Sequence, residues 1–252
     1  MVFGTGVIDP RYPHSYPEGT EFLDGWASHL RGVEHVGVRG PRSAEILEEL
    51  GVHAEVIGDP IAQFAVDRPL GDPDGPVAVN VGHSFGKMWG SEYRALAGMV
   101  DTVSQLRARG TSVEYVVVWP GDMATTRQVA AQSGTGDAPV HAIYHRGTDF
   151  VQLASRWQAI VALKLHAAAL GVCCGLPTVA LEYHPKCQDF MSSVGLADQV
   201  VRTDALEPDV VLDRMDSSAS SDSSSSALAA LAELAGRQRL LADQVLDSWR
   251  LG

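Results

Sequence analysis

Short apolar runs alternate with longer amphipathic stretches along most of the chain. Apolar runs that are rich in β-branched residues and closed by Gly, Pro or Asp predict strands. They fall at residues 2–8, 34–38, 54–57, 77–81, 113–119, 140–142, 159–163 and 178–181. Helical periodicity is found between them, at residues 41–50, 92–109, 125–132, 149–156, 165–174 and 186–194. Strands that alternate with helices predict an α/β protein with parallel sheets whose faces are covered.

Composition divides this pattern into two unequal parts. Residues 67–76 are rich in Pro, Gly and Asp and are the best linker candidate. We therefore predict a shortened N-terminal α/β lobe (residues 1–70) and a larger Rossmann-like lobe (residues 71–216). The first strand, residues 2–8, is expected at a sheet edge, where a helix covers it or a second copy of the chain pairs with it.

The C-terminal part of the chain has a different character. Residues 217–226 are rich in serine and predict a mobile linker, because such a segment cannot bury a core. In residues 227–252, apolar side chains recur at helical spacing, as Leu228, Leu231 and Leu234 illustrate. This stripe predicts a helix that packs back across the two lobes.

The charge of the chain limits its partners. The formal net charge is -12, from 19 Lys and Arg against 31 Asp and Glu. Such a surface repels phosphate backbones, so nucleic-acid binding is not expected. Three cysteines without a CxxC pair predict neither a disulfide framework nor a zinc site, and no cofactor is expected. A reducing, cytoplasmic location and no transmembrane segment are expected.

Candidate chemistry gathers where predicted strands end and helices begin. Lys164 and His166 directly follow the buried strand 159–163. In a parallel sheet this position is the ligand-binding edge, and a helix N-terminus adds unpaired N–H groups that suit a phosphate or carboxylate. A lysine that extends to solvent and a structural histidine would explain the same pattern.

Three further candidates occupy equivalent positions. Lys186 lies in the first turn of the helix that follows strand 178–181, where only a nearby anion would favour a cation. Arg39 follows strand 34–38, and arginine suits bidentate contact with carboxylate or phosphate. His83 follows strand 77–81 in a Gly-rich loop and is a general-acid candidate. Surface lysines, a structural salt bridge and a satisfied histidine are the simpler readings of these three.

The strand-end motifs, taken in order, resemble the polysaccharide pyruvyl transferase family. The matching positions are Arg39, Ser43, Leu47, Gly51, Asp59-Pro60, Lys164-Leu165-His166, Gly175-Leu176-Pro177 and Tyr183 to Lys186. The family has arginine where this chain has Lys164, and its members usually carry a further segment with an Asn-x-Gly-Asp-like loop upstream.

The resemblance implies two Rossmann-like lobes, as in a type-B glycosyltransferase, with phosphoenolpyruvate bound between them. It implies that Arg39, Lys164, Leu165 and His166 line the donor site, joined by Lys186 and His83, with His166 as acid or phosphate contact. Pyruvyl would be transferred as a ketal onto two hydroxyls of a sugar or lipid-linked saccharide. The alternatives are a nucleotide-sugar glycosyltransferase and a degenerate, non-catalytic binding subunit. Under each of these functions the short lobe is a candidate surface for a homo-oligomer.

Overall fold

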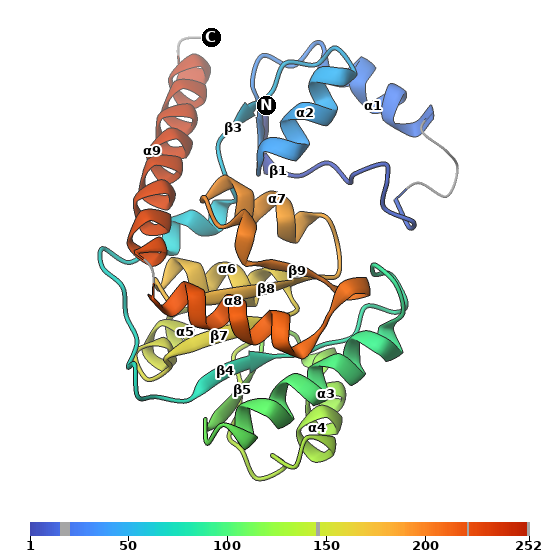
Figure 1. The fold of residues 1–252 in the computed structure, drawn as a ribbon. Helices are drawn as coiled ribbons and strands as arrows, with labels where there is room; N and C mark the ends of the chain where they lie inside the picture. The colour runs from blue at the N-terminus through green and yellow to red at the C-terminus, as the bar shows by residue number, and fades with distance from the viewer. Residues whose placement is uncertain (16–20, 145–146, 221, 251–252) are drawn as a thin grey trace.

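A computed structural model describes residues 1–15, 21–144, 147–220 and 222–250 (Figure 1). The N-terminal part forms a small parallel sheet in the order β1-β2-β3, made of β1 (Val2–Thr5), β2 (Val36–Val38) and β3 (Glu55–Val56). Helices α1 (Glu21–Leu30) and α2 (Pro41–Glu49) accompany it. Ala27, Val38 and Leu47 form part of their common core. Among the described residues β1 pairs only with β2, so it is an edge strand, as predicted.

The larger sheet has six parallel strands in the order β6-β5-β4-β7-β8-β9. They are β4 (Val77–Asn80), β5 (Val113–Val117), β6 (Val140–Ala142), β7 (Ala159–Ala162), β8 (Thr178–Glu182) and β9 (Val200–Arg202). This is the strand order of a doubly wound Rossmann fold, in which the order reverses between β4 and β7. Ligands of such sheets bind outside the carboxyl ends of the strands at this reversal, which lies between the loops after β4 and β7.

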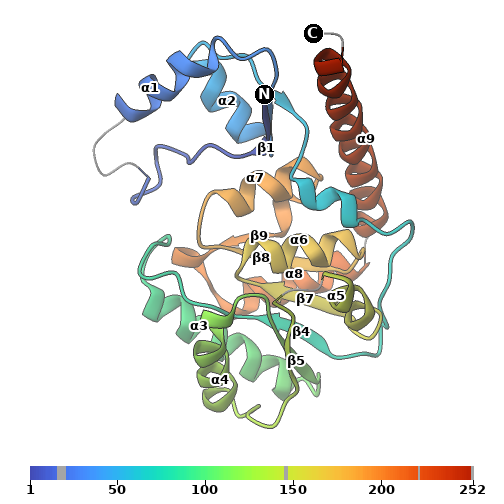
Figure 2. The same ribbon diagram turned by 180° about the vertical axis from the view of Figure 1, so that it is seen from behind.

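Helices cover both faces of the larger sheet, so its four central strands, β4, β5, β7 and β8, are buried throughout. These helices are α3 (Glu92–Ala108), α4 (Met123–Gln132), α5 (Gly147–Ala154), α6 (Leu165–Cys173), α7 (Lys186–Ser193) and α8 (Pro208–Ser220). The last helix, α9 (Ser223–Arg250), packs on α6. Figures 1 and 2 show α6 and α8 on opposite faces. Short 3-10 turns are η1 (Pro60–Phe64), η2 (Pro120–Asp122), η3 (Ala197–Gln199) and η4 (Thr203–Ala205). The α/β class with parallel sheets is confirmed.

The chain crosses from the small sheet to the larger sheet before it reaches the predicted linker, residues 67–76. The N–H groups of Val66 and Leu70 donate to the carbonyl oxygens of Cys173 and Cys174, both at 2.9 Å, at the end of α6. The Pro- and Gly-rich residues therefore already lie against the larger lobe, and the passage falls at residues 57–60. At Gly71, with φ +110°, a Cβ atom would lie 2.8 Å from a backbone oxygen, so glycine here marks close packing rather than a free linker. The limits 1–70 and 71–216 stay predictions.

The serine-rich stretch differs from the expected linker. Helix α8 continues to Ser220 and α9 begins at Ser223, while residue 221 lies outside the described residues, as do 251–252 of the predicted helix. Packing of the flanking Met215, Ala227 and Leu228 into the main core accounts for the helices, because tertiary contacts override the weak helix propensity of serine.

Helix α9 lies along the passage between the lobes (Figures 1 and 2). Leu228, Leu231 and Leu234 of the predicted stripe are buried in the main core. The amide of Gln238, itself buried, donates to the carbonyl oxygens of Ile57 at 2.9 Å and Asp59 at 3.0 Å. None of the helices among the described residues is both long enough and apolar enough to span a bilayer.

Candidate functional site

The predicted polar residues lie at the carboxyl ends of strands in both sheets. Lys164 follows β7 and His83 follows β4, on either side of the reversal in strand order. Lys186 begins α7, the helix after β8. Arg39 follows β2 of the small sheet. Because the carboxyl ends of parallel strands in one sheet share an edge, Lys164, His83 and Lys186 lie where a doubly wound sheet binds ligands, and Arg39 lies at the corresponding edge of the small sheet.

A buried asparagine fixes the backbone at Lys164. Asn80, with no exposed surface, ends β4 and donates its amide to the carbonyl oxygen of Val116 at 2.9 Å. Its side-chain oxygen accepts the N–H of Lys164 at 2.9 Å, and its carbonyl oxygen accepts the N–H of Leu163 at 3.0 Å. Asn80 thus joins β4, β5 and the end of β7, and it determines where α6 starts.

The Lys164 ammonium is held above a buried carboxylate. Its Nζ donates to the carbonyl oxygen of His83 at 2.6 Å and lies 3.3 Å from Oδ1 of Asp122, which has no exposed surface. Burial raises the pKa of Asp122, and Lys164 opposes that rise. Nζ also lies 5.4 Å from the ring centroid of Trp119 and 5.7 Å from that of Tyr183, which are cation–π distances.

Lys186 is a cation without a carboxylate partner. Its Nζ lies 5.0 Å from the ring centroid of Tyr183, the ring that also contacts Lys164. Among the described residues no carboxylate oxygen lies within 4.0 Å of it. Burial lowers the pKa of Lys186, and the charges of Arg39 and Lys164 lower it further. Among the described residues, this half-buried ammonium thus has other cations near it and no carboxylate within 4.0 Å, a setting that a bound anion would stabilise.

Two histidines lie in the field of these cations. Burial lowers the pKa of His166, as do the charges of Lys186 and Arg39, whereas Asp59 opposes them. The side chain nevertheless keeps an exposed surface. Burial, aided by Lys186 and Arg39, lowers the pKa of His184 to about 4. His184 Nδ1 accepts the N–H of Lys186 at 3.3 Å, which leaves Nε2 as the protonated nitrogen of a neutral ring.

Arg39 reaches the same place from the small lobe. Its Nε donates to Oδ2 of Asp59 at 2.7 Å, and both side chains are largely buried. Asp59 also caps η1 by accepting the N–H of Ile61 at 3.0 Å. A Cβ atom on Gly6, in the loop after β1, would lie 2.7 Å from the Arg39 guanidinium, so the loop closely confines this side chain.

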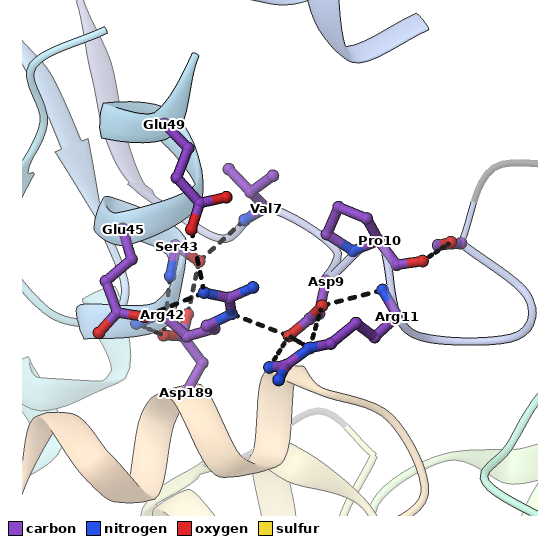
Figure 3. A network of polar contacts seen from close by, with 10 residues as sticks. Val7, Asp9, Pro10, Arg11, Arg42, Ser43, Glu45, Glu49 and Asp189 are labelled. Carbon is purple, nitrogen blue, oxygen red and sulfur yellow. Dashed lines mark hydrogen bonds and ion pairs between the residues drawn. The ribbon is translucent and has the colours of Figure 1, made fainter. Parts of the chain in front are cut away.

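A polar clamp fixes the small lobe to α7 (Figure 3). Oδ1 of the buried Asp189 accepts the N–H groups of Arg42 at 3.0 Å and Ser43 at 3.2 Å, and Oδ2 accepts the Ser43 hydroxyl at 2.6 Å. A residue of the larger lobe therefore caps the N-terminus of α2. Arg42 in turn donates to Asp9 at 2.8 Å. A Cβ atom on Gly40 would overlap the Asp189 backbone, so only glycine allows this approach.

Arg39, Lys164, His166 and Lys186 lie near enough for their charges to act on one another: Lys186 and Arg39 lower the pKa of His166, and Arg39 and Lys164 lower that of Lys186, in each case after the larger effect of burial. His83 contributes its carbonyl oxygen to Lys164, while its ring turns towards Phe85 and Trp119. The Leu165 side chain is buried in the core, so only its backbone faces a ligand position, at the first turn of α6. Among the described residues, no group of three His, Cys, Asp or Glu is arranged to hold a metal.

Sequence reasoning missed three residues of this cluster. Asp122 follows β5 in a Trp-Pro-Gly-Asp turn, and a polar residue at a strand end was the available signal. Tyr183 and His184 lie inside the recognised motif before Lys186, but their stacking and tautomer depend on contacts across the fold. Tyr12 of the small lobe, for example, packs its ring 4.7 Å from the ring of His184.

Comparison with solved structures identifies the fold. A putative UDP-N-acetylglucosamine 2-epimerase from Listeria monocytogenes is 13% identical, with a TM-score of 0.55, over 90% of this chain and 61% of its own. Apo UGT2 from Phytolacca americana is 12% identical, with a TM-score of 0.52, over 96% and 61%. TcCGT1 in complex with UDP is 12% identical, with a TM-score of 0.53, over 91% and 57%. These likenesses confirm a fold of the type-B glycosyltransferase kind, and the chain covers about three fifths of each structure's length.

Comparison of sequences identifies the family. No curated protein sequence matches the chain. The family model described as polysaccharide pyruvyl transferase matches residues 1–185. This range includes Arg39, His83, Lys164 and His166 and ends one residue before Lys186. The chain therefore belongs to the polysaccharide pyruvyl transferase family.

Proposed function

We propose that the protein transfers pyruvyl from phosphoenolpyruvate to two hydroxyls of a saccharide that enters a polysaccharide. One observation carries the proposal: among the described residues Lys186 is a half-buried ammonium without a carboxylate partner, and burial, followed by the charges of Arg39 and Lys164, lowers its pKa. Cations that repel one another within a chain of net charge -12 are stabilised by an anionic small ligand. Phosphoenolpyruvate carries both a phosphate and a carboxylate, which matches several separate cations.

The cations differ in their freedom to bind a donor. Lys164 and Arg39 each hold a carboxylate, Asp122 and Asp59, so they are fixed in place before any ligand arrives. Lys186 has no such restraint and is the candidate for direct contact with phosphate. The first N–H groups of α6, at Leu165 and His166, add donors that a helix cannot satisfy internally.

The chemistry needs a proton at the methylene carbon of the donor. His166 is the proposed acid: a bound phosphate raises its pKa by opposing Lys186 and Arg39, and the ring can then donate. Protonation places positive charge on the central carbon, and one sugar hydroxyl attacks it and loses its proton. Phosphate leaves with the electron pair of the C–O bond, and a second hydroxyl closes the ketal and releases its proton.

The proposed setting is the cytoplasm. Cys173, Cys174 and Cys187 are free and buried, which fits a reducing compartment. The acceptor is proposed to be a sugar or lipid-linked saccharide.

Ligand-induced thermal stabilisation tests the donor. Phosphoenolpyruvate should raise Tm, and Lys186→Ala should weaken its binding roughly 10- to 100-fold, as expected for a lost charge-assisted hydrogen bond. Arg109→Ala is the matched control, because it also removes one positive charge but from a surface pair with Asp216. Stabilisation by UDP instead of phosphoenolpyruvate would replace the proposal by a nucleotide-sugar glycosyltransferase. Stabilisation by neither would favour a non-catalytic binding subunit.

His166→Ala tests the acid. The variant should lower kcat more than it weakens donor binding if His166 supplies the proton. A loss confined to donor affinity would reduce His166 to a phosphate contact.

A further inference from the structure

The loop after β4 and the turn after β5 together present an aromatic surface. Phe85 is 70% exposed and Trp119 is 44% exposed. Their ring centroids are 6.1 Å apart at 67°, and the His83 ring lies 3.8 Å from Phe85 and 6.3 Å from Trp119. Exposed aromatic rings cost hydration free energy, so two of them side by side call for an explanation.

The backbone holds Phe85 in an unfavourable conformation. Its φ is +55°, the only positive φ of a non-glycine residue among those described. The carboxylate of Glu92, in the first turn of α3, accepts the N–H groups of the two flanking residues, Ser84 and Gly86 at 2.7 Å or less. Phe85 N–H donates to His83 Nδ1 at 3.3 Å. Three hydrogen bonds thus hold the loop in place, while Phe85 has a strained backbone and an exposed ring. This combination is typical of functional positions.

This surface adjoins the candidate donor site. The Trp119 ring lies 5.4 Å from Lys164 Nζ, and the same nitrogen binds the carbonyl oxygen of His83. Gly121 allows the Trp119 ring to lie flat on the turn, since a Cβ atom there would be 2.5 Å from it. A ligand that rests on the aromatic surface would therefore meet any group held by Lys164.

We infer that Phe85 and Trp119 form the platform on which the acceptor pyranose stacks, with its hydroxyls directed towards Lys164. The C–H groups of a pyranose face carry partial positive charge and pack against the electron-rich face of an aromatic ring. That the bound sugar is the acceptor rests on the proposed function, whereas the binding of a pyranose to these two rings does not.

A second aromatic pair shows that exposure alone is not the argument. Phe22 and Trp26 on α1 have ring centroids 6.3 Å apart at 67°, and Trp26 is 55% exposed. That pair has nearly the same geometry as Phe85 and Trp119, but it lies on a helix of the small lobe with regular backbone. It provides a matched control for any effect of removing an exposed aromatic ring.

Saturation-transfer NMR with methyl β-D-galactopyranoside, methyl β-D-glucopyranoside and methyl α-D-mannopyranoside tests the platform. At least one should bind the wild-type protein, and Phe85→Gly should bind it roughly two- to tenfold more weakly, the range for loss of one aromatic contact. Glycine accepts a φ of +55°, so the variant removes the ring and keeps the loop. Trp119→Phe should bind more tightly than Trp119→Ala, and Trp26→Ala should bind as the wild type does.

Each outcome decides the inference. Unchanged sugar binding by Phe85→Gly overturns it, as does the failure of all three glycosides to bind the wild-type protein. A donor-induced Tm shift in Phe85→Gly equal to that of the wild type shows that the variant is folded and its donor site intact. If the wild-type protein does not bind phosphoenolpyruvate but binds a glycoside more tightly than Phe85→Gly does, the proposed function is refuted and the aromatic sugar site is supported.

Discussion

Replacing Asp189 by alanine would remove the clamp between the lobes. The carboxylate accepts three hydrogen bonds, two from N–H groups at the start of α2 and one from the Ser43 hydroxyl. Ser43 has no exposed surface, so no solvent replaces the lost acceptor. The Ser43 Oγ still accepts the N–H of Val7 at 2.9 Å, but its hydroxyl proton and the N–H groups of Arg42 and Ser43 lose their acceptor.

The expected loss of stability follows from these contacts. Removing a helix cap costs ~1 kcal/mol. Leaving a buried hydroxyl without its acceptor costs ~1–3 kcal/mol. Burial raises the pKa of Asp189, against the opposing bonds from Ser43, so relief of the buried charge returns part of this cost. We expect Asp189→Ala to lower the free energy of unfolding by roughly 2–3 kcal/mol in total.

Urea unfolding followed by tryptophan fluorescence measures the loss, and Glu45→Ala is the matched control. Glu45 also pairs with Arg42 at 3.0 Å on α2, but its side chain is 61% exposed. An exposed pair of this kind contributes below ~1 kcal/mol. Because the clamp also sets where Arg39 lies relative to Lys186, Asp189→Ala should weaken phosphoenolpyruvate binding, whereas Glu45→Ala should not. Equal urea midpoints for the two variants would refute the reasoning.

Four further outcomes are expected. A phosphate bound near His166 should raise the lowered pKa of its ring, so donor binding at about pH 6.5 should take up more protons in the wild type than in His166→Gln. Calorimetry of donor binding in buffers of different ionisation enthalpy measures this proton uptake. Burial raises the pKa of Glu182 to about 7, so its stabilising protonated state is lost as pH rises from about 4.5 through about 7. Above about pH 7, Glu182→Gln should therefore have a free energy of unfolding on the order of 3 kcal/mol higher than that of the wild type. Equal free energies of unfolding at that pH would show that the pKa of Glu182 is not raised. Asn80→Ala should cost roughly 1–3 kcal/mol and weaken donor binding, since the Lys164 N–H loses its acceptor. If the β1 edge pairs two copies, light scattering should give a dimer mass, and Phe3→Pro, which removes an N–H on the free side of β1, should give a monomer.

The sequence predicts most of the sheet framework because each buried strand is a compact apolar run with a clear end. Lys164 and Lys186 could be placed together for the same reason, since the strand ends of one parallel sheet share an edge. Arg39 follows a strand of the separate small sheet, so its approach depends on how the two lobes pack. Strand β9 has only three residues, and α1 includes Gly25 within a mixed pattern, so neither carries a strong local signal. These elements depend on packing that periodicity does not contain.

The rest of the site depends on contacts between distant parts of the chain. Asp122 becomes the partner of Lys164 only when β5 and β7 lie on either side of β4. The exposure of Phe85 follows from the hydrogen bonds that the Glu92 carboxylate accepts from its loop, and no sequence rule predicts those hydrogen bonds. The serine-rich residues became helical because their neighbours are buried, which local composition cannot reveal.

The contacts of Gln238 have a consequence for the order in which the protein is made. In this sequence the small sheet precedes the larger lobe, and units that are synthesised earlier generally fold first. The carbonyl oxygens of Ile57 and Asp59 nevertheless receive their donor from α9, close to the C-terminus. Asp59 binds Arg39, the residue that the small lobe contributes to the proposed donor site. The position of Arg39 is therefore fixed only after α9 has been synthesised. Because α9 also buries Leu228, Leu231 and Leu234 in the main core, a nascent chain would complete that core and fix Arg39 at the same stage of synthesis.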